Sequence, residues 1–282
     1  MMITGKTMNF GVIGNPIEHS LSPVMQNAAI RAAGIDACYI AMRVHKLAEA
    51  VAGLRALGFR GWNVTIPHKT AIMEFLDEID EDARIIGAVN TVTNERGRLI
   101  GGNTDVSGCI DALRAAGFEP RGKDAVLLGA GGAARAVIWG LLKAGVKRIA
   151  IGVRNVSKAQ PVAEHFRQYG EIKLLDWQDE IFADCLNATD ILINTTPIGM
   201  MPKTDEMPPI SWEQLMKKAF VYDIIYTPQK TRFLQEAEAH GHRILNGEAM
   251  LVGQGAEALR RWTGAEADRE VMTKALRAAL KC

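Results

Sequence analysis

The sequence lacks the features of disulfide-rich, metal-binding and membrane-embedded proteins. Only four of its 282 residues are cysteine (Cys38, Cys109, Cys185 and Cys282), and they form no Cys-x-x-Cys pair. We therefore expect free thiols in a reducing compartment rather than a disulfide framework or a zinc site. No apolar run is long enough to span a bilayer, and the start MMITGKTMNFG lacks the apolar core of a signal peptide. These absences predict a cytoplasmic protein.

An excess of charge of one sign is also missing. The 33 Lys and Arg residues against 32 Asp and Glu leave a formal net charge of +1, which gives no reason to expect a nucleic acid or an anionic membrane as partner. His240 and His242 have the spacing of metal ligands, but no acid or cysteine cluster accompanies them. We interpret them as surface imidazoles and predict no metal site.

Short apolar runs alternate with helical segments along almost the whole chain, which predicts an α/β protein with largely parallel sheets. The length suggests about two domains, with a new strand–helix series starting near residues 103–108. Ser22-Pro23 predicts a helix start with a capping hydroxyl. A further helix is expected at about 69–79, and the runs at 88–94 and 98–103 predict a hairpin, the one clear antiparallel feature.

A glycine-rich loop opens the second series. In AVLLGAGGAARAV, the pattern Gly129-x-Gly131-x-x-Ala134 follows an apolar strand and begins a helix, the context that dinucleotide binding requires. The alternative is an ordinary tight turn of small residues. At the end of the next strand, where NAD sites usually carry an acid, the chain has Arg154 and then Lys158. Two cations there suit the 2′-phosphate of NADP, unless both are merely solvated surface residues.

Two polar segments stand out in the first half. In WNVTIPHK, strand alternation puts Asn63 and Thr65 on one face, and this polar row leads to Lys69 near the start of a helix. A lysine there is a plausible proton shuttle, against the alternative of an exposed surface lysine. In GGNTD, Asp105 is either a functional carboxylate or a cap for the helix starting near Ser107.

Taken together, HSLSPVMQN, WNVTIPHK, GAVNTV, GGNTD, GAGGAARAV, NTTPIGM, YDIIYTP and EAMLVGQGA resemble the shikimate dehydrogenase family, in its order and over nearly the whole chain. The resemblance implies two α/β domains with the active site in the cleft between them, the second being a Rossmann domain. We accordingly expect a substrate-binding and catalytic domain (1–105), an NADP-binding domain (106–243) and C-terminal helices returning to the first domain (244–282). The implied reaction is the NADPH-dependent reduction of 3-dehydroshikimate to shikimate in aromatic amino-acid biosynthesis.

The resemblance also implies roles for individual residues. Lys69 and Asp105 match the family's catalytic pair. Ser20 and Ser22 would bind the substrate carboxylate, and the remaining expected contacts to the substrate are Asn63, Thr65, Asn90, Tyr226 and Gln254. The expected cofactor contacts are Gly129, Ala130, Gly131, Gly132 and Ala133 at the pyrophosphate, Arg154 and Lys158 at the 2′-phosphate, and Met200 near the nicotinamide.

The chain departs from the family at the strand end that selects the cofactor. Val153-Arg154-Asn155 stands where NADP-type members often carry Asn-Arg-Thr, so dual use of NAD stays an alternative. A quinate/shikimate dehydrogenase is a second alternative, because one extra ring hydroxyl distinguishes quinate and a small change can admit it. A non-catalytic NADP-binding sensor is a third, although it would not need Lys69 and Asp105 together. A homodimer is compatible with the sequence.

Overall fold

The computed structural model describes residues 3–280, which fold into two compact units. Unit 1 contains the chain up to Gly108 and again from Val252, and unit 2 contains Cys109–Leu251. Two helices, α4 (Asp105–Ala115) and α9 (Glu248–Thr263), contribute residues to both units. Both units are α/β, as predicted. No helix in the described part of the chain has the length and apolar character needed to cross a membrane.

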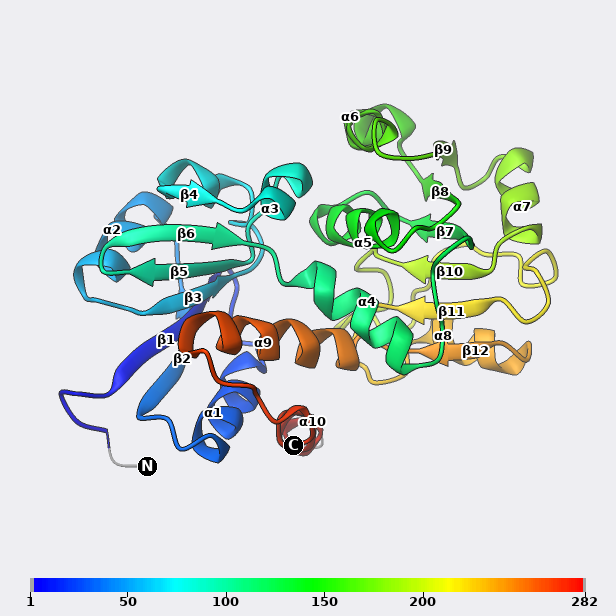
Figure 1. The fold of residues 1–282 in the computed structure, drawn as a ribbon. Coiled ribbons are helices and arrows are strands. Elements are labelled where there is room, and N and C mark those ends of the chain that lie inside the picture. Colours follow the sequence, from blue (N-terminus) through cyan, green and yellow to red (C-terminus); the bar gives the residue numbers. More distant parts are fainter. Residues whose placement is uncertain (1–2, 281–282) are drawn as a thin grey trace. The chain divides into compact units, whose positions relative to one another are not determined.

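Unit 1 is built on a mixed six-stranded sheet of order β2-β1-β3-β5-β6-β4 (Figure 1). The strands are β1 (Met8–Gly14), β2 (Ala37–Arg43), β3 (Gly61–Val64), β4 (Glu78–Ile79), β5 (Thr91–Glu95) and β6 (Arg98–Gly102). The predicted hairpin β5–β6 is confirmed, but β3 also pairs antiparallel with β5. This unpredicted pairing sets Asn63 directly opposite Thr91, at the centre of the site described below.

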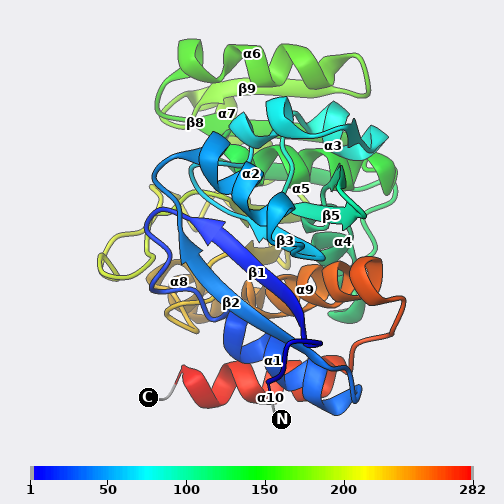
Figure 2. The same ribbon diagram turned by 90° about the vertical axis from the view of Figure 1, so that its left-hand side faces the viewer.

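Four further helices belong to unit 1, namely α1 (Ser22–Ala32), α2 (Leu47–Ala56), α3 (Glu81–Ile86) and α10 (Arg269–Ala279). Helix α10 packs against α1, far from it in sequence (Figure 2). The end of α9 is held by Trp262, whose ring stacks on Phe10 at 5.1 Å and whose Nε1 donates to the Val92 carbonyl at 3.0 Å. A Cβ on Gly61 would lie 2.2 Å from that Nε1, so only glycine leaves room for the indole.

Two local predictions in unit 1 were wrong. Residues 69–79 form no α-helix but a 3-10 helix, η1 (Ala71–Phe75), followed by β4. The segment around Asp77 bonds to the edge strand β6 instead of continuing a helix. The Asp77 amide donates to the Leu99 carbonyl, and the Leu99 amide donates to the Asp77 carboxylate. Ser22 does not cap α1, whose N-cap is Leu21 and has no side-chain hydrogen bond. The Ser22 amide instead donates to the Ser20 hydroxyl at 3.4 Å.

Unit 2 is a fully parallel sheet of order β12-β11-β10-β7-β8-β9. Its strands are β7 (Asp124–Leu128), β8 (Arg148–Val153), β9 (Ile172–Asp176), β10 (Ile191–Asn194), β11 (Phe220–Asp223) and β12 (Arg243–Leu245), and its helices are α5 (Gly132–Lys143), α6 (Val156–Arg167), α7 (Glu180–Asn187) and α8 (Arg232–Ala239). Counted from β7, this is the order 3-2-1-4-5-6 of a Rossmann fold, and the chain reverses direction across the sheet between β7 and β10. The Rossmann prediction is confirmed.

The structure agrees with the prediction of free thiols for two cysteines but not with the prediction that both histidines lie on the surface. Cys38 and Cys185 are free thiols, while Cys282 lies outside the described residues. His240 is exposed, but His242 is buried at 7% exposure, so the surface prediction was wrong for it. His242 directly precedes β12, and its Nδ1 lies 3.1 Å from the Ala219 carbonyl oxygen. Burial lowers the pKa of His242. No group of three His, Cys, Asp and Glu side chains within residues 3–280 is arranged to hold a metal ion.

Candidate active site

A lysine and a carboxylate from separate loops meet in unit 1. Lys69 lies in the turn between β3 and η1, and Asp105 is the first residue of α4, directly after β6 and residues 103–104. The Lys69 Nζ donates to Asp105 Oδ2 at 2.6 Å, and the two side chains are only 20% and 11% exposed. The Lys69 carbonyl accepts from the Val89 amide at 2.8 Å, which fixes the backbone under the amine. The pair is therefore positioned, partly shielded from water and still accessible to a ligand.

Asn90 sets the orientation of the Asp105 carboxylate. Its Nδ2 donates to Asp105 Oδ1 at 2.8 Å and to Thr104 Oγ1 at 3.1 Å, so both amide hydrogens are used. Its Oδ1 accepts from the Thr104 amide and from the Thr91 hydroxyl, each at 2.8 Å. A buried side chain with every hydrogen bond satisfied is rigid. In this arrangement Asn90 offers a ligand no free amide hydrogen, and its visible effect is to hold Asp105.

Asn63 continues the same network along the sheet. Its Nδ2 donates to the opposing Thr91 hydroxyl at 3.0 Å and to the Asn90 carbonyl at 3.2 Å, while its Oδ1 accepts from the Tyr39 hydroxyl at 2.8 Å. Thr65 follows directly after β3 and is half-buried. Asn63 of the predicted polar row thus belongs to a buried hydrogen-bonding network, and the chain continues through Thr65 to Lys69.

Helix α1 begins at Ser22, two residues after Ser20, and also contacts α9. Ser20 and Ser22 are half-buried, and the Ser22 amide donates to the Ser20 hydroxyl at 3.4 Å. One turn further on, the buried Gln26 donates from Nε2 to the Gly255 carbonyl at 2.9 Å. That contact fixes α9 at the residue after Gln254, which is 9% exposed. Unit 1 therefore contains all predicted substrate contacts except Tyr226.

His68, although next to Lys69, is a packing residue. It is buried at 8% exposure, and its Nε2 lies 3.0 Å from the Val44 carbonyl oxygen.

The glycine loop of unit 2 fits a dinucleotide pyrophosphate. Gly129 has φ +97°, and a Cβ there would lie 2.8 Å from the Thr196 methyl, so the turn requires glycine. A Cβ on Gly131 or Gly132 would meet no heavy atom within 4 Å, which leaves the backbone open to a ligand. Gly131 caps α5 without a side chain, and the first turn of α5 has no acidic residue. The positive end of that helix is thus free to accept a phosphate. Ala130 and Ala133 lie in the same segment.

The expected 2′-phosphate residues follow β8. Arg154 comes directly after the strand and Lys158 lies in the first turn of α6; both are exposed. Asn155 caps that helix, accepting from the Lys158 amide at 2.9 Å, which ties the segment to the helix start. No acidic side chain lies between Val153 and Lys158 that would repel a 2′-phosphate.

A buried aspartate, Asp223, organises the loops after β10 and β11. It accepts hydrogen bonds from the Thr231 hydroxyl at 2.6 Å, the Ile225 amide at 3.0 Å and the Asn194 amide nitrogen at 3.1 Å. Burial raises the pKa of Asp223 to about 6, against the opposing effect of these bonds. The loops it joins carry Met200, which is 43% exposed, and Tyr226, whose pKa is raised by burial.

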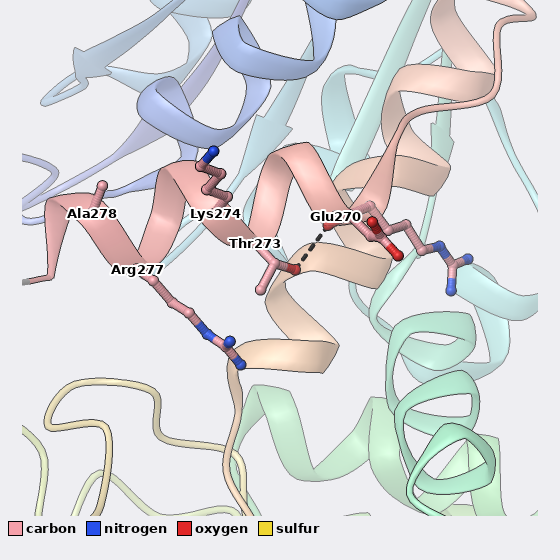
Figure 3. A pocket seen from close by; sticks show the side chains of 6 residues that line it. Glu270, Thr273, Lys274, Arg277 and Ala278 are labelled. Atoms are coloured by element: carbon pink, nitrogen blue, oxygen red, sulfur yellow. Dashed lines mark hydrogen bonds between the residues drawn. The ribbon is translucent and has the colours of Figure 1, made fainter.

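A surface hollow elsewhere in unit 1 contains no predicted site residue. Its lining comes from the outer face of α10 alone, namely Arg269, Glu270, Thr273, Lys274, Arg277 and Ala278 (Figure 3). The Thr273 hydroxyl donates a hydrogen bond to the Arg269 carbonyl at 2.8 Å. We assign this hollow no ligand.

Sequence reasoning missed three residues of the network, Tyr39, Thr91 and Thr104. Thr91 and Thr104 stand next to Asn90 and Asp105 inside the motifs, and strand pairing of these motifs would have identified them. Tyr39 stands in the apolar strand segment CYIAMRV, where nothing distinguishes it from a core aromatic.

Comparisons with known protein families match three parts of the chain. Residues 12–92 match the shikimate dehydrogenase substrate-binding domain, residues 112–225 match shikimate/quinate 5-dehydrogenase, and residues 247–277 match the shikimate 5′-dehydrogenase C-terminal domain. The matches cover most of both units, and the first and third correspond to the two segments of unit 1.

Individual relatives agree with these matches. The shikimate dehydrogenase (NADP(+)) of Methanopyrus kandleri is 46% identical over 281 residues, covering 97% of this chain and 96% of the relative. The crystal structure of shikimate 5-dehydrogenase from Listeria monocytogenes, in complex with shikimate and NAD, superimposes with a TM-score of 0.93 at 38% identity and covers 98% of each chain. A shikimate dehydrogenase solved with NADP+ gives a TM-score of 0.91 at 41% identity, covering 99% of this chain and 98% of that one.

Proposed function

The chain belongs to the shikimate dehydrogenase family, and we propose that it interconverts 3-dehydroshikimate and shikimate with NADP, as a step of aromatic amino-acid biosynthesis. The observation that carries this proposal is the Lys69–Asp105 ion pair at 2.6 Å, held inside the network of Asn90 and Asn63. A surface lysine would need neither the shielding nor the oriented carboxylate.

The pair performs the proton transfer in this proposal. A nicotinamide cofactor held at the glycine loop would supply the hydride to the substrate's carbonyl carbon, and its oxidised form would accept the hydride in the reverse reaction. Lys69, as an ammonium, donates one proton to the oxygen that becomes the hydroxyl, and recovers it in oxidation. Asp105 holds the amine toward that oxygen, and Asn90 prevents the carboxylate from rotating away. A positioned general acid of this kind contributes about 10²–10⁴-fold to the rate.

The proposed substrate residues can form hydrogen bonds to the carboxylate and hydroxyl groups of a small polyhydroxy acid. In the proposal Ser20 and Ser22 bind its carboxylate, and Asn63, Thr65, Gln254 and Tyr226 account for the hydroxyls. Asn90, whose amide is fully used within the protein, contributes by holding Asp105 rather than by the direct contact expected from the sequence. Each hydroxyl left without a partner on burial would cost about 1–3 kcal/mol, which explains why so many amides and hydroxyls gather here.

The nucleotide residues come from unit 2. We propose that Gly129, Ala130, Gly131, Gly132 and Ala133 hold the pyrophosphate, that Arg154 and Lys158 hold the 2′-phosphate, and that Met200 contacts the nicotinamide. The open backbone at Gly131 and Gly132 and the exposed cations after β8 support this assignment. In domain terms, residues 1–105 with the helices of 244–282 bind the acid, and residues 106–243 bind the nucleotide.

Replacing Lys69 by Ala tests the proposal. Turnover of shikimate should fall by about 10²–10⁴-fold, because the acid–base group is lost, while NADP affinity measured by calorimetry should stay within about twofold. Replacing the exposed Lys46, which forms an ion pair with Glu49 on the surface, should change neither. Unchanged turnover in Lys69→Ala would refute the assignment.

A second candidate is a quinate/shikimate dehydrogenase that uses NAD or both nucleotides. It is favoured by Val153 and Asn155 beside Arg154 and by the matched family, whose description includes quinate. Steady-state rates for shikimate and quinate with NADP and NAD separate the two. A non-catalytic sensor would give no turnover with any combination. A cytoplasmic location and a homodimer stay predictions, to be tested by fractionation and by light scattering.

A further inference from the structure

One peptide group of unit 1 bonds to the chain at both members of the proposed catalytic pair. It joins Ala88 to Val89, two buried residues between α3 and β5. Its N–H, on Val89, donates to the Lys69 carbonyl at 2.8 Å. Its carbonyl, on Ala88, accepts from Asn103 Nδ2 at 2.9 Å. Because a peptide group is planar and rigid, these two bonds fix the chain at Lys69 relative to the chain just before Asp105.

The peptide group itself has a fixed position. Gly87 ends α3 with φ +69°, and the amides of Gly87 and Ala88 both donate to the Ala83 carbonyl, at 3.0 and 3.2 Å. On the other side, the Asn90 amide donates to the Gly102 carbonyl at 3.1 Å. The segment is therefore anchored to the end of a helix and to the neighbouring strand β6.

Asn103 connects this peptide group to Asp105. It is 4% exposed, and its two polar ends bond in different directions. While Nδ2 donates to the Ala88 carbonyl, Oδ1 accepts from the Asp105 amide at 3.0 Å. Asp105 begins α4, and the first amides of a helix have no acceptor within it. The Asn103 side chain supplies that acceptor and so fixes the point at which α4 begins.

Asn103 and Asn90 restrain different parts of Asp105. Asn90 donates to carboxylate Oδ1, which fixes the rotation of the side chain. Asn103 bonds the main-chain amide, which fixes the point from which the side chain extends. With both restraints in place, carboxylate Oδ2 is held 2.6 Å from the Lys69 Nζ. Without Asn103, the start of α4 could move and carry the carboxylate away from the amine.

We propose that Asn103 is a positioning residue for the proposed reaction. It ties the main chain of Asp105 to the peptide group that also holds Lys69, and so sets the separation of the carboxylate and the amine. The role depends on the proposed function. In it, Asn103 acts through Asp105 and contacts neither substrate nor cofactor.

The variant Asn103→Ala removes both bonds in the full-length enzyme. The kcat for shikimate oxidation should fall about tenfold to hundredfold, the loss expected when a catalytic group is misplaced by about 1 Å. The KM for shikimate and the Kd for NADP should stay within about threefold, because the binding groups are unchanged.

The matched control is Asn94→Ala, at the other end of β5. Asn94 is also buried and also bonds two backbone groups, donating to the Phe59 carbonyl at 2.8 Å and accepting from the Gly97 amide at 2.7 Å. This variant should lower the urea midpoint of unit 1 about as much as Asn103→Ala does, but leave kcat within about twofold. A loss of kcat as large as that of Asn103→Ala would show that destabilisation alone explains both.

An enzyme without the carboxylate separates positioning from a structural effect. In Asp105→Ala there is nothing for Asn103 to position, so adding Asn103→Ala should reduce the residual kcat, measured at high enzyme concentration, less than about twofold. An equal loss with and without the carboxylate would show a merely structural role and overturn the positioning. An unchanged kcat in Asn103→Ala alone would overturn it as well.

Asn103→Ser covers the case in which Asn103→Ala fails to fold. A serine hydroxyl can accept from the amide two residues on, but it is one bond shorter than the Asn amide and falls short of the Ala88 carbonyl. Its kcat should fall about threefold to tenfold with Asp105 present and less than about twofold in Asp105→Ala. If neither Asn103 variant folds, the residue serves the fold and the positioning is wrong. A wild-type enzyme that neither binds nor oxidises shikimate would instead refute the proposed function.

Discussion

Replacing Asp223 by Asn should change how the stability of unit 2 depends on pH. The carboxyl group is fully buried, and its pKa is raised from 3.8 to about 6 by burial, in spite of bonds from Thr231, Ile225 and Asn194. Its stabilising contribution is therefore complete below pH 3.8, where folded and unfolded chains are both protonated. It is lost as pH rises to about 6, because the unfolded chain ionises first.

The size of the effect follows from the gap between the two pKa values. About two pH units at about 1.4 kcal/mol each correspond to about 3 kcal/mol. The amide of Asn fits the same space and does not ionise. The free energy of unfolding of Asp223→Asn, relative to wild type, should therefore increase by about 2–3 kcal/mol between pH 4 and pH 7.

Amide hydrogen exchange reports this change within unit 2. Val221 and Tyr222 lie on the strand that ends at Asp223 and are fully buried, so their amides are expected to exchange through opening of the core of that unit. The control is Asp124→Asn, since the Arg148 guanidinium lowers the pKa of Asp124. The contribution of the Asp124 carboxylate to stability is lost only as pH falls below 3.8. The free energy of unfolding of Asp124→Asn should therefore lie below that of wild type by the same amount throughout the range from pH 5 to pH 7. A difference between Asp223→Asn and wild type that stays equal at pH 4 and pH 7 would refute the reasoning.

Two further predictions concern the nucleotide and the core of unit 1. Arg154→Ala should raise the Kd for NADP about tenfold to hundredfold, because a charge-assisted hydrogen bond to the 2′-phosphate is lost. The Kd for NAD should stay within about twofold. If calorimetry showed equal losses of affinity for both nucleotides, the 2′-phosphate would lie elsewhere. Gly61→Ala should destabilise unit 1 by about 1–3 kcal/mol in urea unfolding, because its Cβ would lie 2.2 Å from the Trp262 Nε1. Gly53→Ala, in α2 with open space around it, should instead stabilise by about 0.5–1 kcal/mol, and a similar gain for Gly61→Ala would contradict the packing described here.

The elements that the sequence determined are those that depend on neighbours along the chain. The apolar run before Gly129, the glycines at the start of α5 and the turn at Arg96-Gly97 each specify their own backbone geometry. The parallel strands of unit 2 can also be predicted from single segments of the sequence, because buried strands of a parallel sheet are apolar on both faces and appear as short apolar runs. The family motifs added the site residues by resemblance.

The tertiary structure decided where polar side chains find their partners. Lys69 and Asp105 are 36 positions apart, and only the pairing of β3 with β5 and of β5 with β6 brings their loops together. The predicted α-helix at 69–79 is replaced by a 3-10 helix and the strand β4, because residues 77–79 bond to β6. A buried polar group must bond whatever lies beside it in the fold. That neighbour comes from another strand, so no pattern within one segment of the sequence can specify it.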